Sequence, residues 1–109
     1  MFLDTSGLLC YIDGRDARHH DAVTLFHSAS TRLTHSYVLA EFIPLCMTRN
    51  MPRQTTLEFA AQLLDPAAVT VVWVDIVLHR AALEYLEQRF DKTYSLCDAV
   101  SFLLLKQWE

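Results

Sequence analysis

Glycine, proline and cysteine are all scarce in this sequence. Two glycines and three prolines in 109 residues, beside 52% hydrophobic residues, exclude a collagen-like repeat, a flexible linker and a disordered chain. The three cysteines are an odd number without C-x-x-C spacing, which excludes a disulfide framework. We expect Cys10, Cys46 and Cys97 to be reduced and buried, as in a cytoplasmic protein. The sequence predicts one compact domain over residues 1–109.

Targeting and membrane segments are also missing from the sequence pattern. The N-terminal residues MFLDTSGLLCYID contain two aspartates and no basic start, which excludes a secretory or transit peptide. No uncharged apolar run approaches the roughly 20 residues of a membrane helix. The five histidines form no H-x-x-x-H pair or Cys/His cluster, so a structural zinc site is not expected. These patterns predict a soluble, cytoplasmic protein.

Positive charge is in deficit. Nine Lys and Arg against thirteen Asp and Glu give a net charge of −4, opposite to the basic surface of a protein that holds nucleic acid through phosphate contacts alone. Either nucleic acid is not the partner, or the acids gather at a cation site that itself attracts phosphate. Arg15, Arg49 and Arg53 are candidate phosphate contacts, although isolated arginines at helix ends are usually only solvated.

Strand and helix patterns alternate along the chain. Short apolar or β-branched runs predict strands at residues 1–4, 32–34 and 69–74. Helical periodicity predicts helices that start near Leu8 and that cover residues 16–29, 36–47, 53–64, 77–89 and 99–108. Ser36 is the expected N-cap of the third helix, and Pro44 predicts a kink or break within it. The alternation favours an α/β fold with a parallel sheet.

Four carboxylates interrupt otherwise apolar segments. They are Asp4, Glu41, Asp75 and Asp98. Because a buried, unpaired carboxylate is costly, each is expected to have a cation or hydrogen-bond donors beside it. For Asp4 and Asp98 the alternative to a ligand role is a helix cap, and for Asp75 a turn or cap is the default interpretation.

Glu41 has the most apolar surroundings of the four acids. We expect its helix to point the carboxylate into the fold, with an ion pair to Arg32 or Arg49 as the alternative. Several carboxylates that meet without lysine are most simply neutralised by a hard divalent cation such as Mg²⁺ or Mn²⁺. Such an ion activates water for attack on phosphorus, so the pattern predicts phosphodiester hydrolysis.

Three motifs in order along the chain resemble the PIN domain family, most closely the VapC-type toxins of type II toxin-antitoxin systems. They are FLDTS at residues 2–6, VLAEF at 38–42 and YSLCDAVSF at 94–102, so the resemblance spans nearly the whole chain. It implies a three-layer fold with a central parallel sheet flanked by helices. It also implies that Asp4, Glu41 and Asp98 bind Mg²⁺ or Mn²⁺ for endonucleolytic RNA cleavage, with Thr5 or Ser6 helping to order the site. A homodimer and a small antitoxin partner are implied as well.

The family pattern usually has a fourth acid in a Thr-x-Asp-like segment after a further strand, and no such segment occurs in these 109 residues. The sequence therefore predicts a PIN-like domain that is incomplete at its C-terminus and lacks that strand. The alternative function is a PIN-like module that binds an antitoxin or RNA without cutting. A haloacid-dehalogenase-type phosphatase needs a second aspartate two residues after Asp4, where Ser6 stands. A phospho-receiver lacks its paired acids after the first strand.

Overall fold

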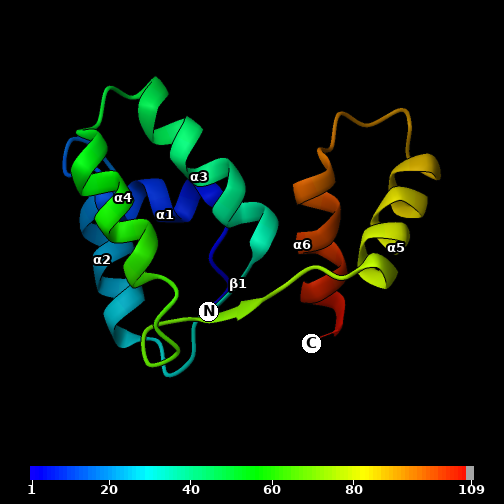
Figure 1. Ribbon diagram of the computed structural model, residues 1–109, viewed down its shortest axis with the longest axis horizontal. Coiled ribbons are helices and arrows are strands. Elements are labelled where there is room, and N and C mark those ends of the chain that lie inside the picture. The colour runs from blue at the N-terminus through cyan, green and yellow to red at the C-terminus, as the bar shows by residue number, and fades with distance from the viewer. Residues whose placement is uncertain (108–109) are drawn as a thin grey trace. The chain divides into compact units, whose positions relative to one another are not determined.

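The computed structural model describes residues 1–107, and these form two compact units. The N-terminal unit covers Met1–Val72, and the C-terminal unit begins at Trp73. Figure 1 shows the elements of each unit. Within residues 1–107, no helix is both long enough and apolar enough to span a bilayer.

The sheet of the N-terminal unit is short and parallel. Strand β1 (Leu33–His35) pairs in parallel with β2 (Thr70–Val72), with Thr34 opposite Val71. On the other edge of β1, Phe2 forms a parallel bridge to Leu33, so β1 lies between the N-terminal segment and β2. The predicted α/β class with a parallel sheet is confirmed.

Four helices complete the N-terminal unit (Figure 1). They are α1 (Thr5–Ile12), α2 (His19–Ser28), α3 (Ser36–Thr48) and α4 (Arg53–Gln62). Helix α1 packs against α2 and α3, and α3 packs against α4. Along α3 the buried residues are Val38, Phe42 and Cys46, spaced by four residues, so one ridge of this helix enters the core.

The C-terminal unit is a pair of packed helices, α5 (Ile76–Glu87) and α6 (Leu96–Gln107). The buried positions of α6 include Cys97, Val100 and Leu104, whereas Ala82 is the buried residue of α5. All three cysteines are buried and outside any disulfide, as predicted.

Several helix boundaries differ from the predictions. Helix α1 begins at Thr5 rather than near Leu8, because the Asp4 carboxylate caps it. Helix α2 begins at His19 rather than at residue 16, because Asp16 is held in a turn that precedes the helix. Helix α6 begins at Leu96 rather than at residue 99, and its predicted last residue, Trp108, lies outside the described residues.

The structure also bears on the two predictions made for α3. Pro44 does not break the helix, which runs from Ser36 to Thr48. Its exposed ring lies away from the buried ridge, so the missing N–H falls on the solvated side. The N-cap is His35 rather than Ser36: the His35 Nδ1 accepts hydrogen bonds from the backbone N–H groups of Tyr37 and Val38.

A charged cluster joins the end of α1 to the end of α3. The Asp13 and Asp16 side chains are only 7% and 9% exposed. Arg49 Nη1 lies 2.9 Å from Asp16 Oδ2 and 3.5 Å from Asp13 Oδ2, while Arg15 Nε donates to Asp13 Oδ1 at 3.0 Å. Arg15 also donates to the Arg49 carbonyl at 2.7 Å. These contacts make Arg15 and Arg49 structural residues.

Hydrogen bonds hold the carboxyl pKa values of this cluster below their ordinary value of 3.8. For Asp13 the largest cause is the Arg15 side chain, and for Asp16 it is the backbone N–H of Arg18, followed by Arg49. A lowered folded-state pKa adds stability that is complete above the unfolded value and disappears as the pH falls through the folded value.

We therefore predict that the free energy of unfolding falls as the pH drops below 3.8, and that Arg49→Met makes this fall shallower. Urea unfolding monitored by circular dichroism across an acid pH series measures the slope. Arg53→Gln is the control, because it removes a cation outside the cluster. Equal slopes in all three proteins would show that the cluster does not couple folding to pH.

Candidate functional site

Asp4 is positioned by the end of the first extended segment. The Leu3 N–H donates to the Leu33 carbonyl at 2.8 Å, and the Leu3 carbonyl accepts from the buried Thr34 hydroxyl at 2.7 Å. Because hydrogen bonds hold both the N–H and the carbonyl of Leu3, Asp4 is placed at the start of α1. There, Asp4 Oδ1 accepts the backbone N–H of Gly7 at 2.7 Å.

Glu41 lies on α3, between one and two turns after the His35 cap, and its side chain is exposed. The expectation that it points into the core is wrong. Its apolar neighbours include the buried ridge of α3, but Glu41 belongs to the adjacent ridge with the exposed Leu45. Among residues 1–107, Glu41 makes no hydrogen bond or ion pair.

The expected ion-pair partners of Glu41 are engaged elsewhere. Arg49 belongs to the Asp13–Asp16 cluster. Arg32 donates to the carbonyls of Ala68 and Phe26 at 2.7 and 2.6 Å. The ion-pair alternative for Glu41 is therefore wrong, and its carboxylate is available to a ligand.

Asp98 stands in the first turn of α6, and its side chain is exposed. Its Oδ2 accepts the Ser95 N–H at 3.0 Å, while the Ser95 Oγ accepts the Asp98 N–H at 3.0 Å. This reciprocal pair is a capping box that fixes both the helix start and the carboxylate. Asp75 has the cap role that the sequence predicts: its Oδ1 accepts the Leu78 N–H at 2.8 Å.

The four acids are thus exposed, and the sequence-based expectation that they are buried was wrong. Asp4, Asp75 and Asp98 sit at helix N-termini, where capping and the helix dipole stabilise a carboxylate without burying it. Capping and ligation are compatible, because a carboxylate has two oxygens.

The donor set fits a hard divalent cation. Asp4 uses Oδ1 in its cap and Asp98 uses Oδ2, so each keeps a second oxygen without a partner among residues 1–107. Asp4 and Glu41 belong to the N-terminal unit and Asp98 to the C-terminal unit. Over the part of the chain that the structure describes, no three His, Cys, Asp or Glu side chains form a ready-made metal group.

Three positioning residues were missed in the sequence. Ser95 carries a readable signal, since Ser-x-x-Asp spacing before an apolar run is the pattern of a capping box. Thr34 and His35 carry none, because their hydrogen bonds to Leu3 and to the start of α3 depend on strand pairing. Thr5 is buried and Ser6 exposed at the start of α1.

The chain was compared with family models, with curated protein sequences and with solved structures. No family model and no curated protein sequence matches the chain. The crystal structure of Mycobacterium tuberculosis VapC20, described as a sarcin-ricin loop cleaving toxin, is similar with a TM-score of 0.85 and 31% sequence identity. The match covers 97% of this chain and 81% of VapC20.

The likeness to VapC20, together with the acid after the N-terminal extended segment and the acid in the first turn of α6, defines an α/β protein of the PIN class. At 31% identity over most of both chains, the similarity extends beyond the fold to the family. The chain belongs to the VapC-type PIN-domain family.

Gly7 is close to the Asp4 carboxylate: a Cβ at Gly7 would lie 3.1 Å from Asp4 Oδ1. We predict that Gly7→Ala weakens Mn²⁺ binding several-fold, because the carboxylate must move. Replacing glycine by alanine at an unhindered helix position raises the free energy of unfolding by about 1 kcal/mol, and we predict a smaller rise for Gly7→Ala. Titration calorimetry with Mn²⁺ and urea unfolding measure the two effects.

Gly14→Ala is the matched control, because nothing lies within 4 Å of a Cβ at Gly14. Unchanged Mn²⁺ affinity in Gly7→Ala, with the full helical gain in stability, would contradict a fixed Asp4 carboxylate.

Proposed function

We propose that this protein is a divalent-metal-dependent endoribonuclease, the toxin of a toxin-antitoxin pair, with Asp4, Glu41 and Asp98 as the ligands of Mg²⁺ or Mn²⁺. The observation that carries the proposal is the likeness to VapC20, a sarcin-ricin loop cleaving toxin, over 97% of this chain. The free carboxylate oxygens of the three acids support it further.

The protein's contribution to such a reaction is orientation. The Gly7 N–H holds one oxygen of Asp4 and the Ser95 N–H holds one oxygen of Asp98, so the remaining oxygens are fixed without a further loss of side-chain freedom. A bound divalent cation supplies an activated water and stabilises charge on the phosphate. Thr5 and Ser6, beside Asp4, help to order this end of α1.

The remaining parts of the proposal follow from the family. We expect a cytoplasmic protein that forms a homodimer and is inhibited by a small antitoxin. The substrate is an RNA whose phosphodiester is accessible in a loop, and the sarcin-ricin loop that VapC20 cleaves is the first one to test.

The test is cleavage of a sarcin-ricin loop RNA and of a pool of structured RNAs in Mg²⁺ or Mn²⁺. We expect discrete products that EDTA abolishes and that Asp98→Asn reduces by at least about 100-fold. Asparagine keeps an oxygen to accept the Ser95 N–H, so α6 should remain capped.

Asp75→Asn is the matched control, since the Asp75 carboxylate also accepts a backbone N–H at a helix start, as the N-cap of α5, and is not a proposed ligand. It should cleave at the unmodified rate. Intact RNA in every metal, with a folded protein that still binds RNA, would refute the nuclease and favour the non-cutting binding module.

A further inference from the structure

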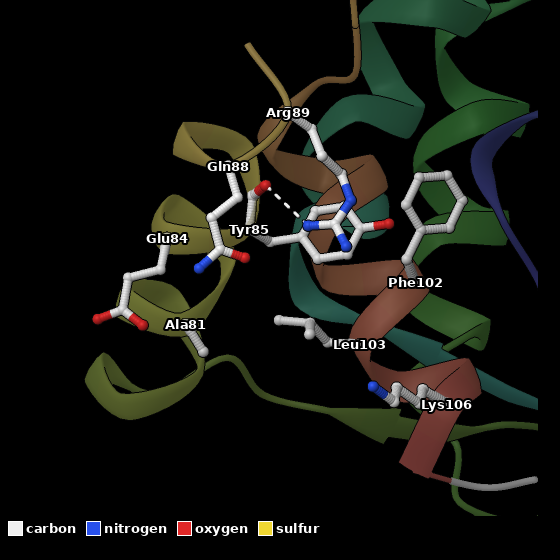
Figure 2. A pocket seen from close by; sticks show the side chains of 8 residues that line it. All are labelled: Ala81, Glu84, Tyr85, Gln88, Arg89, Phe102, Leu103 and Lys106. Atoms are coloured by element: carbon white, nitrogen blue, oxygen red, sulfur yellow. Dashed lines mark hydrogen bonds between the residues drawn. The ribbon is translucent and has the colours of Figure 1, made fainter.

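A pocket lies between the two helices of the C-terminal unit, where α6 lines it with Phe102, Leu103 and Lys106 (Figure 2). Its polar and aromatic lining includes Glu84, Tyr85, Gln88, Arg89, Phe102 and Lys106. All of them belong to α5, α6 or the residues just after α5, so the pocket is complete within one unit. The nuclease site proposed above does not use these residues.

Arg89 is the most strongly oriented cation of the pocket. Its guanidinium carbon lies 3.7 Å above the centre of the Tyr85 ring, and its Nη1 donates to the Tyr85 carbonyl at 3.2 Å. The stacking fixes the plane of the guanidinium, while Nε and Nη2 have no acceptor among residues 1–107. A planar donor group of this kind matches the oxygens of a phosphate.

Lys106 provides a second cation from the facing helix. It forms no ion pair within residues 1–107. The one carboxylate of the pocket, on Glu84, points away from Arg89 in Figure 2 and is not within ion-pair distance of either cation. The pocket therefore presents two cations without a counter-ion.

Most other cations of this acidic chain are already engaged. Arg15, Arg18 and Arg49 pair with Asp13 or Asp16. Lys92 lies 3.9 Å from Asp91, and Arg32 is bound to backbone carbonyls. In a chain of net charge −4, Arg89 and Lys106 are thus among the few cations that remain available to bind an anion.

The pocket shares helix α6 with Asp98, one of the proposed metal ligands. Asp98, Phe102 and Lys106 are spaced by four residues, so they follow one face of the helix. At about 1.5 Å per residue, Lys106 lies roughly 12 Å along the helix from Asp98. An RNA strand cut at Asp98 therefore brings a neighbouring phosphate within reach of Lys106.

We propose that Arg89 and Lys106 form a phosphate-binding subsite that holds the RNA strand a few nucleotides away from the cleaved bond. This inference rests on the proposed function, because it takes single-stranded RNA as the ligand. The position on the same helix as Asp98 favours RNA over an acidic peptide.

The test measures binding of a short, labelled single-stranded RNA by fluorescence anisotropy, in EDTA and over a range of salt concentrations. We expect the double variant Arg89→Gln/Lys106→Gln to bind roughly tenfold more weakly. The slope of log Kd against log salt should fall by about 1.4, because each phosphate contact on a single strand contributes about 0.7.

Arg80→Gln is the matched control: it removes one cation from exposed α5 surface outside the pocket and should leave the slope unchanged. Lys106→Gln alone guards against a folding defect, since Lys106 is exposed and makes no hydrogen bond within residues 1–107. It should lower the slope by about 0.7.

The outcomes separate the two proposals. A double variant that binds RNA like Arg80→Gln overturns the subsite, while cleavage by the unmodified chain would leave the nuclease standing. A lowered slope in a chain that never cleaves supports the subsite and refutes the nuclease. Unchanged RNA binding together with lost binding of an acidic peptide would assign the pocket to a protein ligand and overturn the subsite.

Discussion

The two hydrogen bonds on the Leu3 backbone position much of the N-terminal unit. The Leu3 N–H is held by the Leu33 carbonyl and its carbonyl by the Thr34 hydroxyl, which fixes the N-terminal segment against β1. The same strand continues into His35, whose ring nitrogen caps α3. One three-residue strand thereby sets the start of the helix that follows Asp4 and the start of the helix that carries Glu41. A buried hydroxyl without its acceptor is costly, so this arrangement has little freedom to shift.

Helix starts explain how acids can be ordered without being buried. In both Asp4 and Asp98, one carboxylate oxygen accepts a backbone N–H, and the other has no partner among residues 1–107. Exposure at a helix N-terminus avoids the desolvation cost that a buried carboxylate would carry. The observed cap role is therefore compatible with the metal-ligand role proposed for the same side chains.

Charge is distributed differently in the two units. In the N-terminal unit, the arginines of the Asp13–Asp16 cluster fasten the end of α1 to the end of α3, and Arg32 fastens the start of β1 to neighbouring carbonyls. In the C-terminal unit, Arg89 stacks on Tyr85 and keeps donors free. A negative net charge is thus compatible with an anion-binding surface in the C-terminal unit, because Asp13 and Asp16 of the N-terminal unit pair with arginines of that same unit.

The sequence by itself determined the α/β class, the alternation of elements and the three motifs that place the chain among the VapC-type PIN domains. Local periodicity, capping residues and motif order are all properties of short segments. The sequence led to a wrong prediction that the Glu41 side chain is buried, because apolar neighbours show that a helix is partly buried but not which ridge faces inward. It also took Arg49 for a surface residue and missed Thr34 and His35. Only the tertiary structure decided these, since each depends on a partner brought close by strand pairing or helix packing.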